Sequence, residues 1–509
     1  MSFTPPRSIL IIGSGVFGLS TADALTRRPD FAHTTITVVD RGSGWLADGD
    51  VANDDDDDRH FPARDAASID SSRIIRPDYA DPAYAALANE AQALWRTPVD
   101  TSQDYIGGDG RYSESGLVVI ADADVDGHEK LPGQKKTGLD YVRESWANVR
   151  AMAQTDSYLA ERLKLLPDPE AIRAAVGTGG TTGSWGYLNG ASGWANAEAS
   201  MAWMLKRVRQ TGRVHFVRGR VISLCKEMTS TTTTVTGVAL DDGRTLTADL
   251  VVVAAGAWTE ALLDGAPSSS SSSLSSSPSG LVGSLAATGQ VLGYVPLAAD
   301  EHVRIATMPV VLNLSSGLFV IPPAADSHVL KVARHGYGYI NPVPSSSAPS
   351  SVLSVPFTTQ DDPDLQIPKE GADDLRRGLH DIIPLPGLAS RPFGRTRICW
   401  YTDTPTADFL IDYHPHWNGL FFATGGSGHG FKFLPVLGPK IVDCIARCPP
   451  EAFRQKWAWK HRQTTVVEPE QDAGKDTTAF WKAVVCHDGS RGGQPGLILQ
   501  EELAKASLP

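Results

Sequence analysis

Cysteine is scarce in this sequence of 509 residues, which contains five of them, spread between Cys225 and Cys486. An odd number of scattered cysteines does not suit a disulfide framework, so we expect a reducing compartment rather than secretion. Long apolar runs are also missing, and none approaches the roughly 20 residues that a membrane-spanning helix needs. We therefore expect neither a signal peptide nor a membrane span.

Clusters of basic residues are missing as well. The chain has 46 Lys and Arg against 58 Asp and Glu, which gives a formal net charge of -12 at pH 7. Nucleic-acid phosphates favour clustered Lys and Arg, so this balance argues against a nucleic-acid partner. We expect no metal site, because the dense acidic run at residues 54–58 lacks the spaced ligands and turn glycine of a calcium loop. Small-molecule chemistry is the favoured class.

Four low-complexity stretches interrupt the chain. They are five aspartates at residues 54–58, four threonines at 231–234, PSSSSSSLSSSPSG at 267–280 and PSSSAPSS at 344–351. Such segments bury too little apolar surface to offset the entropy lost on ordering them. We predict that all four are surface loops.

A βαβ unit is predicted near the N-terminus. Residues 7–12 (RSILII) predict an apolar strand, residues 16–28 a helix, and residues 34–40 (TTITVVD) a second strand rich in β-branched side chains. The stretch GSGVFG at residues 13–18 is a GxGxxG motif that follows the first strand and opens the helix. Glycines there permit a tight turn and let the backbone approach a pyrophosphate, whose charge the helix N-terminus favours.

An acidic residue follows this motif at the distance that a dinucleotide fold requires. The second strand ends at Asp40, where the carboxylate of such folds binds ribose hydroxyls, and Arg41 comes next. This context predicts dinucleotide binding rather than a merely glycine-rich turn.

Later segments extend the same fold. Residues 245–258 (TLTADLVVVAAGAW) predict a buried strand ending at Gly256, and residues 418–445 predict a strand, a glycine-rich turn and a helix. The predicted fold is α/β, an α+β arrangement of two discontinuous domains: a Rossmann-type nucleotide domain and a substrate domain built on a mixed β-sheet. We assign 1–84, 196–265 and 396–450 to the nucleotide domain, 85–195 and 281–395 to the substrate domain, 266–280 to a serine-rich insertion and 451–509 to a C-terminal extension.

The nucleotide domain resembles the FAD domain of glutathione-reductase-like flavoproteins, because its companion strand arrives much later in the chain than the fingerprint. A second GxGxxG motif after a strand, which would bind a nicotinamide cofactor, is absent from the sequence. These features favour FAD as the sole redox cofactor, with oxygen or another small acceptor taking the electrons.

Further motifs resemble one family. They are SSRIIRPDYADPAY at residues 71–84, LKVARHGYG at 330–338, RICWYTDTPTADFLID at 397–412 and GGSGHGFKF at 425–433. Together they are similar to the monomeric sarcosine oxidase and fructosyl-amino-acid oxidase (amadoriase) family of flavoproteins, nearest the fungal pipecolate and saccharopine oxidase branch. The resemblance fades in the low-complexity insertions and beyond about residue 450.

Two arginines in the first motif are candidate site residues. Arg73 and Arg76 are three residues apart, which fits one helical turn with both cations on one face. Surface salt bridges are the alternative. The resemblance implies that Arg76 holds the substrate carboxylate, where a planar guanidinium suits two oxygens, and that Arg73 lies against the flavin. It makes Lys432 the second partner of the carboxylate, although taken alone this lysine is as readily an exposed one.

Lys331 and His335 are four residues apart in an apparent strand, whose alternation puts them on the same face. An inward-facing lysine is costly unless its charge is used. The resemblance implies that Lys331 contacts flavin N5 through water and promotes the reaction of reduced flavin with oxygen, which a nearby positive charge assists. It places His335 in the same pocket, whereas the residues alone favour a structural histidine.

Cys399, in RICWYTDTP, has four possible roles: core residue, nucleophile, metal ligand or attachment point. A nucleophile would need a nearby base, and His414 and His416 lie past an intervening strand. A metal ligand would need partners at a usable spacing, which Cys399 lacks. A core residue is the ordinary reading of an isolated cysteine. The resemblance implies instead a thioether between Cys399 and the 8α-methyl group of FAD.

The resemblance and the fingerprint together define a set of candidate residues. Lys331, Arg73 and His335 are candidates for catalysis, and Arg76 and Lys432 for substrate binding. The candidates for FAD contacts are Gly13, Gly15, Val16, Phe17, Gly18, Asp40, Arg41, Ser72, Arg73, Val221, Gly256, Trp258, Cys399, Gly428, Gly430 and Lys432.

The resemblance implies a monomeric FAD-dependent oxidase that converts the C–N bond of a secondary-amine amino acid to an imine and reduces O2 to H2O2. Sarcosine, pipecolate, saccharopine and fructosyl amino acids would share the carboxylate contact. The alternatives are a tailoring oxidase of fungal alkaloid biosynthesis, a nicotinamide-dependent dehydrogenase and a non-catalytic nucleotide-binding protein. Relatives often end in a peroxisomal SKL-like tripeptide, whereas this sequence ends in SLP, so we expect the cytoplasm.

Overall fold

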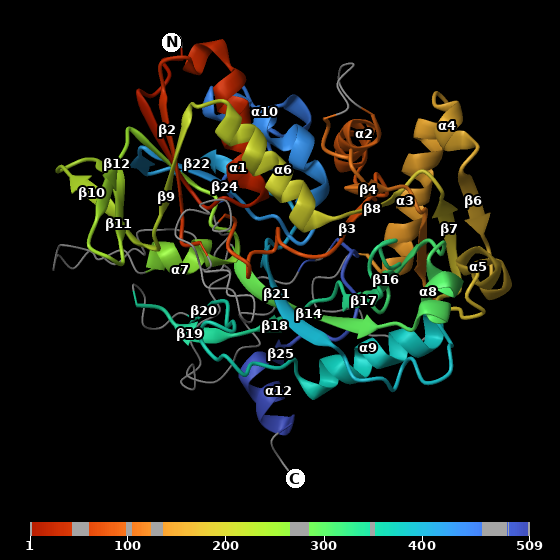
Figure 1. Cartoon of the computed structure of the whole chain (residues 1–509). Helices are drawn as coiled ribbons and strands as arrows, with labels where there is room; N and C mark the ends of the chain where they lie inside the picture. The colour runs from red at the N-terminus through yellow and green to blue at the C-terminus, as the bar shows by residue number, and fades with distance from the viewer. Residues whose placement is uncertain are drawn as a thin grey trace.

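The computed structural model describes residues 3–42, 61–97, 104–123, 136–264, 285–346, 352–460, 486 and 488–506. The aspartate run and the serine-rich stretch, which were predicted as loops, lie outside these residues, and so does most of the stretch 344–351. Figure 1 shows two main sheets. One takes its strands from the N-terminal part of the chain and from residues 214–253 and 410–424, and the other takes most of its strands from the middle of the chain and one short strand from near the C-terminus.

The first sheet has six strands in the order β22-β24-β13-β1-β2-β9, which pair in parallel except that β22 is antiparallel to β24. The central strands are rich in Val, Ile and Phe and are buried on both faces, as parallel strands usually are. The bounds are β1 Ser8–Ile12, β2 Thr35–Asp40, β9 Val214–Arg218, β13 Leu250–Val253, β22 Leu410–Tyr413 and β24 Leu420–Thr424.

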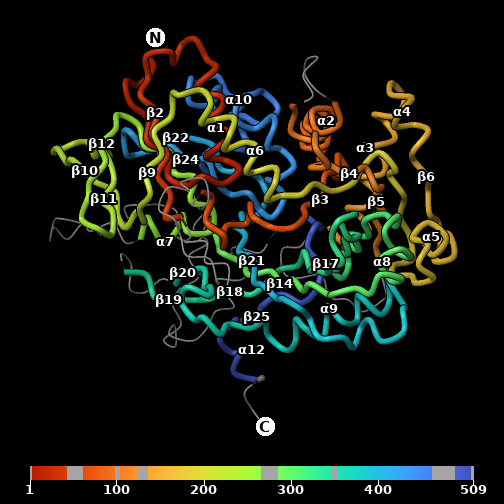
Figure 2. Tube along the Cα trace, in the orientation of Figure 1, coloured from red at the N-terminus to blue at the C-terminus, as the bar shows by residue number. Residues whose placement is uncertain are grey.

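Helices cover one face of this sheet and share its hydrophobic core. They are α1 Val16–Arg27, α2 Pro82–Arg96, α6 Ala197–Gln210 and α10 Leu434–Ile445. β1, α1 and β2 confirm the predicted βαβ unit, and β24 and α10 confirm the strand and helix predicted at 418–445. Figure 2 shows α1 and α10, red and blue, side by side, so two segments far apart in the sequence build one layer.

A small antiparallel sheet covers the other face. It consists of β10 Val221–Met228, β11 Thr233–Leu240 and β12 Thr245–Thr247, with β23 Trp417–Asn418 paired to β11. The prediction of one strand across 245–258 was wrong. The segment crosses from this sheet into β13, which ends at Val253, and a 3-10 turn occupies Gly256–Trp258. The crossing is fixed at Asp249, whose side chain accepts from the backbone N–H groups of Arg7 and Ser8.

The threonine run at 231–234 is only partly a loop, contrary to the prediction. Thr231 and Thr232 lie in the turn between β10 and β11, whereas Thr233 and Thr234 begin β11. The β-branched threonine side chain suits a strand, and pairing with β10 decides the outcome.

The second sheet has ten strands in the order β25-β18-β14-β17-β16-β15-β5-β7-β6, with β21 also paired to β14. The pairs β15 with β5 and β18 with β25 are parallel and the other pairs antiparallel, so the sheet is mixed, as predicted. The bounds are β5 Leu117–Ala121, β6 Leu163–Leu166, β7 Trp185–Asn189, β14 Ala286–Pro296, β15 Val310–Asn313, β16 Leu318–Ile321, β17 Val329–Arg334, β18 Tyr339–Ile340, β21 Arg395–Asp403 and β25 Leu497–Ile498.

Helices cover both faces of the second sheet. α3 Gly138–Ala153 packs on the face that carries Leu292 and Phe319. The opposite face packs against α5 Pro169–Val176, α8 Ala299–Ile305, α9 Lys369–Ile382 and α12 Leu499–Ala506. Two C-terminal elements, β25 and α12, therefore belong to the body of the second sheet.

Short elements join the two sheets. A three-stranded sheet contains β3 Arg73–Ile75, β8 Gly193–Ala195 and β4 Tyr112–Ser113, and a hairpin contains β19 Pro342–Pro344 and β20 Val352–Ser354. The remaining helices among the described residues are α4 Ser157–Ala160 and α7 Thr259–Asp264, with 3-10 turns at Pro29–Phe31, Phe431–Phe433 and Glu451–Phe453. In the part of the chain that is described, no helix combines the length and apolarity needed to cross a bilayer. The domain limits assigned from sequence stay a prediction.

Candidate active site

A cleft of about 1300 Å3, partly open to solvent, lies at the carboxyl ends of the parallel strands of the first sheet. Its walls come from the loops after β1, β2, β13 and β24, and from residues 63–68. Ligands of open α/β sheets bind at this end of the strands. The cleft contains most of the predicted FAD contacts: Gly13, Gly15, Val16, Phe17, Asp40, Arg41, Arg73, Val221, Gly256, Trp258, Gly428 and Gly430.

The GxGxxG turn brings the backbone to the cleft. Gly13 has φ of +99°, and a Cβ there would lie 2.5 Å from the Ala254 carbonyl oxygen. Gly18 does not line the cleft, but a Cβ there would lie 1.9 Å from the Gly13 oxygen, so only glycine lets α1 approach the turn. At the start of the helix, the Val16 N–H donates to Ser68 Oγ at 3.1 Å.

Asp40 holds the glycine turn in place. Its Oδ2 accepts from the Ser14 N–H and the Ser14 hydroxyl, both at 2.7 Å, and its Oδ1 accepts from the Gly42 N–H at 3.0 Å. Arg41 stacks on the Trp258 ring at 4.1 Å from its centroid. The acidic residue thus supports the turn and still lines the cleft, where its remaining lone pairs are available to hydroxyl groups.

A second pocket, of about 660 Å3, adjoins the cleft and shares Arg73, Tyr401, Gly428 and Phe431 with it. It lies between β3, the face of the second sheet and the turn after β24. The structure brings together in it eight residues that the sequence analysis had singled out: Ser72, Arg73, Arg76, Lys331, His335, Cys399, Gly428 and Lys432.

The two arginines reach this pocket from a strand. Arg73–Ile75 is β3, so the prediction that Arg73 and Arg76 share one turn of helix was wrong. Pairing of β3 with β8 holds this segment extended, with Arg73 opposite Ala195. Arg76 follows the strand, and both side chains line the pocket.

A buried carboxylate, Asp70, fixes two of the cations. Lys331 Nζ donates to Asp70 Oδ2 at 2.7 Å and to the Ser72 carbonyl at 2.6 Å, and Arg73 Nη1 is ion-paired with the same Oδ2. Burial alone would raise the pKa of Asp70, but the charges of Arg73, Lys331 and Arg397 hold it well below its usual range. Burial lowers the pKa of Lys331 to about 8, against the opposing effect of Asp70.

Arg76 and Lys432 both lie near the ring of Tyr79. The Arg76 guanidinium and the Lys432 ammonium position are each 5.1 Å from that ring centroid. Arg76 is 5% exposed, and its Nη1 has no hydrogen-bond partner among the described residues. A buried guanidinium with an unused donor calls for an anion.

His335 meets a residue from the C-terminal segment. Its Nδ1 lies 3.2 Å from Nη1 of Arg491 and 3.5 Å from the hydroxyl of Tyr401. Burial, and then the charge of Arg491, hold the pKa of His335 well below its usual value, so the ring is neutral. Arg491 is itself ion-paired with Asp403 at 2.6 Å. His335 follows the end of β17 and lines the pocket with Lys331, as the strand alternation predicted.

Comparison with known proteins identifies the family. A family model described as FAD dependent oxidoreductase matches residues 8–443. The chain belongs to the FAD dependent oxidoreductase family. It is 33% identical to amino acid oxidase imqH of Aspergillus flavus, over 86% of this chain and 93% of the relative. It is 28% identical to the L-saccharopine oxidase of Schizosaccharomyces pombe, over 89% of this chain and 93% of the relative.

A solved structure agrees with this assignment. The fructosamine oxidase of Aspergillus fumigatus (Amadoriase II), in complex with FSA, superposes with a TM-score of 0.71 at 25% identity. The match covers 97% of this chain and 96% of that one. The predicted fold and the predicted family are both confirmed.

The cleft of this FAD dependent oxidoreductase fits FAD. Gly13 and Gly15 line the cleft without side chains, so their backbone would let a pyrophosphate approach the N-terminus of α1; a Cβ on Gly15 would also lie 2.8 Å from Ser68 Oγ. Asp40 and Arg41 would hold the adenosine end, and Tyr401 and Gly428 would border the flavin ring where the cleft meets the second pocket. A nicotinamide cofactor, the sequence-based alternative, is not what this family is described as using.

Cys399 lies at the junction of the two cavities. It is 1% exposed and belongs to the second pocket, while its neighbours Trp400 and Tyr401 line the FAD cleft. Its Sγ lies 3.5 Å from Nη2 of Arg73. In the part of the chain that is described, no cluster of His, Cys, Asp and Glu could hold a metal ion, so the metal-ligand role for Cys399 finds no partners.

Sequence reasoning missed several residues of the site. Asp70 stands one residue before the quoted SSRIIR motif, and Tyr79 and His429 lie inside quoted motifs without having been given a role. A fully buried carboxylate beside two cations is a signal that only the fold reveals. Arg491 comes from the segment treated as an extension, and nothing in its local sequence marks it.

Proposed function

We propose that this protein is an FAD-dependent oxidase that converts the C–N bond of a secondary-amine amino acid to an imine and passes the electrons to O2, giving H2O2. One observation carries the proposal: a pocket next to the FAD cleft gathers three buried cationic residues, Arg76, Lys432 and Lys331, which are far apart in the sequence. The relatives support it, since their names include amino acid, saccharopine and sarcosine oxidases.

The substrate carboxylate binds between Arg76 and Lys432. The unused Nη1 of Arg76 and the buried Nζ of Lys432 both belong to the second pocket, and neither is ion-paired in the described structure. A carboxylate meeting both would form charge-assisted hydrogen bonds of the stronger kind. Fixing the substrate by this end orients its amine-bearing carbon toward the cleft.

FAD, when bound, supplies a hydride acceptor at the junction of the cleft and the pocket. Lys331 is placed to assist the later reaction with oxygen, because its cation stays buried beside the junction, fixed by Asp70 and the Ser72 carbonyl. Negative charge that develops on oxygen is stabilised by such a preorganised cation.

We propose that Cys399 carries the FAD through a thioether to its 8α-methyl group. Its place at the junction of the two cavities supports this, and so does the guanidinium of Arg73 at 3.5 Å from the sulfur. Acid precipitation of the purified protein tests it, with yellow colour expected in the pellet of wild type and in the supernatant of Cys399→Ser. Free flavin from the wild type would contradict the attachment and leave the oxidase proposal standing.

The pocket wall favours a substrate with an apolar group. Two further cations near it are already paired, Arg334 with Glu370 and Asp374 and Arg491 with Asp403, which disfavours substrates with several carboxylates. The rest of the wall includes apolar side chains: Ile74, Leu292, Leu312, Phe319, Ile321 and Ala333. We therefore propose an N-alkylated or cyclic amino acid with one carboxylate and an aliphatic or aromatic side chain.

Oxygen consumption by the purified protein tests the proposed function. N-methylated amino acids with apolar side chains should be oxidised without NAD(P), with H2O2 formed in equal amount. A colourless protein that consumes no oxygen with any secondary amino acid would contradict the proposal. Mass analysis of the products separates a catabolic oxidase, whose imine hydrolyses, from a biosynthetic tailoring oxidase, whose imine is captured in a ring. We propose a monomer in the cytoplasm.

A further inference from the structure

The proposed reaction needs a group that takes a proton. A free amino acid carries an ammonium group at neutral pH, and only the neutral amine has the electron pair that expels a hydride. The guanidinium groups of Arg73 and Arg76 are never deprotonated in proteins. Lys331 is committed to Asp70. A base must therefore lie elsewhere in the second pocket.

His429 fixes the direction of a hydrogen-bond chain next to this pocket. Its Nε2 lies 2.8 Å from the carbonyl oxygen of Ala407, which can only accept, so Nε2 carries the hydrogen. Burial, and then the charge of Lys432, hold the pKa of His429 well below its usual value, so the ring is neutral. Its Nδ1 is therefore an acceptor, and the hydroxyl of Tyr79, 3.0 Å away, donates to it.

Lys432 completes the chain. Its Nζ lies 2.8 Å from Tyr79 Oη and 3.0 Å from the His429 carbonyl oxygen. Because the Tyr79 hydroxyl donates its hydrogen bond to His429, its oxygen accepts from Lys432. A neutral amine has two hydrogens and one lone pair, and both hydrogens find acceptors here. The lone pair occupies the position on the nitrogen that the carbon and the two hydrogens leave. Lys432 lines the second pocket, so this position can face a ligand there.

The electrostatic surroundings favour the neutral form of Lys432 while no anion is bound. Burial, and then the charge of Arg76, hold the pKa of Lys432 well below its usual value. The nearest carboxylate, Asp78, is already bonded to Asn189 and Ser192. The titratable and charged groups around Lys432 and its partner His429 are Arg76, Asp78, Tyr79, Tyr84, His335 and Arg491.

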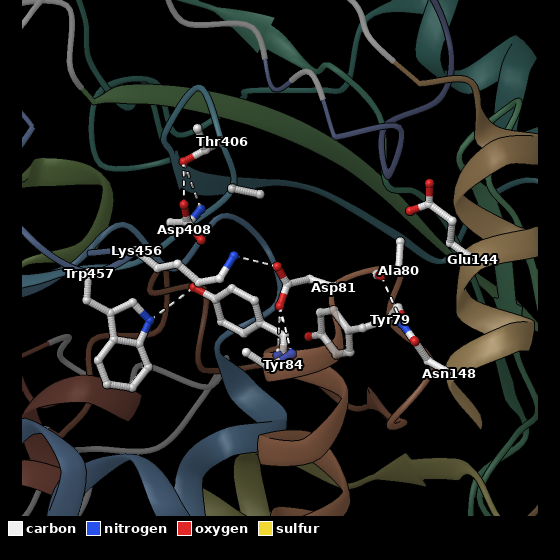
Figure 3. Close-up of polar contacts among 12 residues, drawn as sticks. Tyr79, Ala80, Asp81, Tyr84, Glu144, Asn148, Thr406, Asp408, Lys456 and Trp457 are labelled. Carbon is white, nitrogen blue, oxygen red and sulfur yellow. Dashed lines mark hydrogen bonds and ion pairs between the residues drawn. The ribbon is translucent and has the colours of Figure 1, made fainter. Parts of the chain in front are cut away.

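The backbone at Tyr79 is held by contacts that keep its hydroxyl in the hydrogen-bond chain with His429 and Lys432. As Figure 3 shows, Asn148 of α3 donates to the carbonyl oxygens of Tyr79 and Ala80, at 2.9 and 2.8 Å. Asp81 caps α2 and pairs with Lys456 at 2.5 Å, from a segment beyond α10. Two elements distant in sequence thus fix the backbone from the tyrosine to the start of α2.

We propose that Lys432 is the base that takes the proton of the substrate ammonium, and that Tyr79 and His429 are positioning residues that direct its lone pair into the pocket. The N–H bond of the ammonium breaks and leaves its electron pair on nitrogen, and a new N–H bond forms at Nζ. The substrate carboxylate, one carbon from the amine, then pairs with the lysine cation and Arg76. The proton leaves Lys432 when the product carboxylate departs.

Proton uptake on binding of a non-oxidisable carboxylate tests this directly. The probe is (methylthio)acetate, which replaces the N–H of a secondary-amine amino acid by sulfur and therefore brings a carboxylate without a proton. Isothermal titration calorimetry of the flavin-loaded enzyme, in two buffers of different ionisation enthalpy at the same pH, counts the protons bound. The wild type should take up close to one proton per enzyme near neutral pH.

Two variants locate the proton. Lys432→Arg keeps a cation for the carboxylate, but arginine stays protonated and cannot act as a base. The variant should therefore bind the probe without proton uptake and oxidise substrate at least about 100-fold more slowly than the wild type. Lys440→Met, which removes a lysine of α10 paired with Glu90, should take up the proton as the wild type does. Flavin absorbance shows whether each variant has folded.

Tyr79→Phe tests the positioning role, because it removes the acceptor of one Lys432 hydrogen. We expect the pH at which half a proton is taken up to shift and kcat to fall more than KM changes; an unchanged midpoint would contradict the positioning role. Wild-type binding with no uptake, or uptake that persists in Lys432→Arg, would overturn the inference. The inference takes its substrate from the proposed function. An enzyme that oxidises secondary amino acids but takes up no proton on binding the probe would contradict the role of Lys432 as base and leave the proposed function standing.

Discussion

At the scale of single residues, Asp70 holds two cations that line the second pocket. Its two carboxylate oxygens meet Lys331, Arg73, the hydroxyl of Tyr294 at 2.5 Å and the Ser71 N–H at 2.7 Å. A fully buried carboxylate is tolerated because two cations and two neutral donors compensate it. Its removal would leave those cations uncompensated in the same low-dielectric pocket.

Asp70→Asn should lower the free energy of unfolding by about 3 to 5 kcal/mol, because it breaks a buried ion pair and leaves Lys331 unpaired. The pKa of Asp70 is depressed in the fold. Its contribution to the free energy of unfolding is therefore full at pH values above the pKa of an unfolded aspartate and is lost as the pH falls toward the folded pKa. The free energy of unfolding of the variant should therefore fall less steeply at acid pH than that of the wild type. Urea denaturation at neutral and acid pH measures both. A variant as stable as the wild type would contradict the role.

Lys331 should make the reaction with oxygen depend on pH. Its folded pKa of about 8 lies below the ordinary lysine value, so its charge is lost as the pH rises through about 8. Stopped-flow mixing of reduced enzyme with oxygen should show slower reoxidation on the alkaline side. The reduced flavin of Lys331→Met should be reoxidised slowly at every pH. A wild-type reoxidation rate that stays constant into alkaline pH would contradict a role of this lysine in the reaction with oxygen.

At the scale of elements, the turn after β24 depends on glycine where it meets β21. Gly428 has φ of +66°, and a Cβ there would lie 2.2 Å from the ring of Tyr401. Gly428→Ala should therefore displace Tyr401 and reduce flavin content, at a cost of about 2 to 4 kcal/mol. Gly110→Ala is the matched control, since Gly110 has φ of +74° with nothing within 4 Å, and it should keep its flavin. Equal flavin content in both variants would contradict the steric argument.

Patterns carried in short stretches were predictable from the sequence. The βαβ unit and the strand, turn and helix at 418–445 follow from local apolar runs and glycines, and the structure confirms them. The segment Arg73–Ile75 was predicted as a helical turn from its spacing, but pairing with β8 makes it a strand. Residues 245–258 were predicted as one strand, but two sheets compete for them.

At the scale of the whole molecule, the site is closed by a segment that sequence reasoning set aside. Arg491 reaches Asp403, the Ser427 carbonyl and His335 from a stretch near the C-terminus, and its side chain is 1% exposed. Local composition could not place it, because its partners are distant in the sequence and meet it only in the fold. The catalytic candidates were found through quoted motifs, whereas this contact needed the tertiary structure.

Arg491→Met should destabilise the protein by about 3 to 5 kcal/mol, because it leaves Asp403 buried without its cation. Adding Asp403→Asn should recover part of that loss, since the two residues are directly coupled. The midpoints of urea denaturation of the two single variants and the double variant measure the coupling. Strictly additive effects would show that the ion pair does not tie the C-terminal segment to β21.

The central claim is that a buried pair, Arg76 and Lys432, holds the carboxylate of a secondary-amine substrate for oxidation next to the FAD cleft. The most direct test is oxygen consumption by the purified protein with N-methyl-phenylalanine and, in parallel, with the same amine lacking its carboxylate, N-methyl-phenethylamine. We predict oxygen consumption with an equal amount of H2O2 for the amino acid and at least about 100-fold slower oxidation of the amine, the loss of a charge-assisted contact pair. Equal rates for the two compounds, or no oxidation of either, would contradict the account.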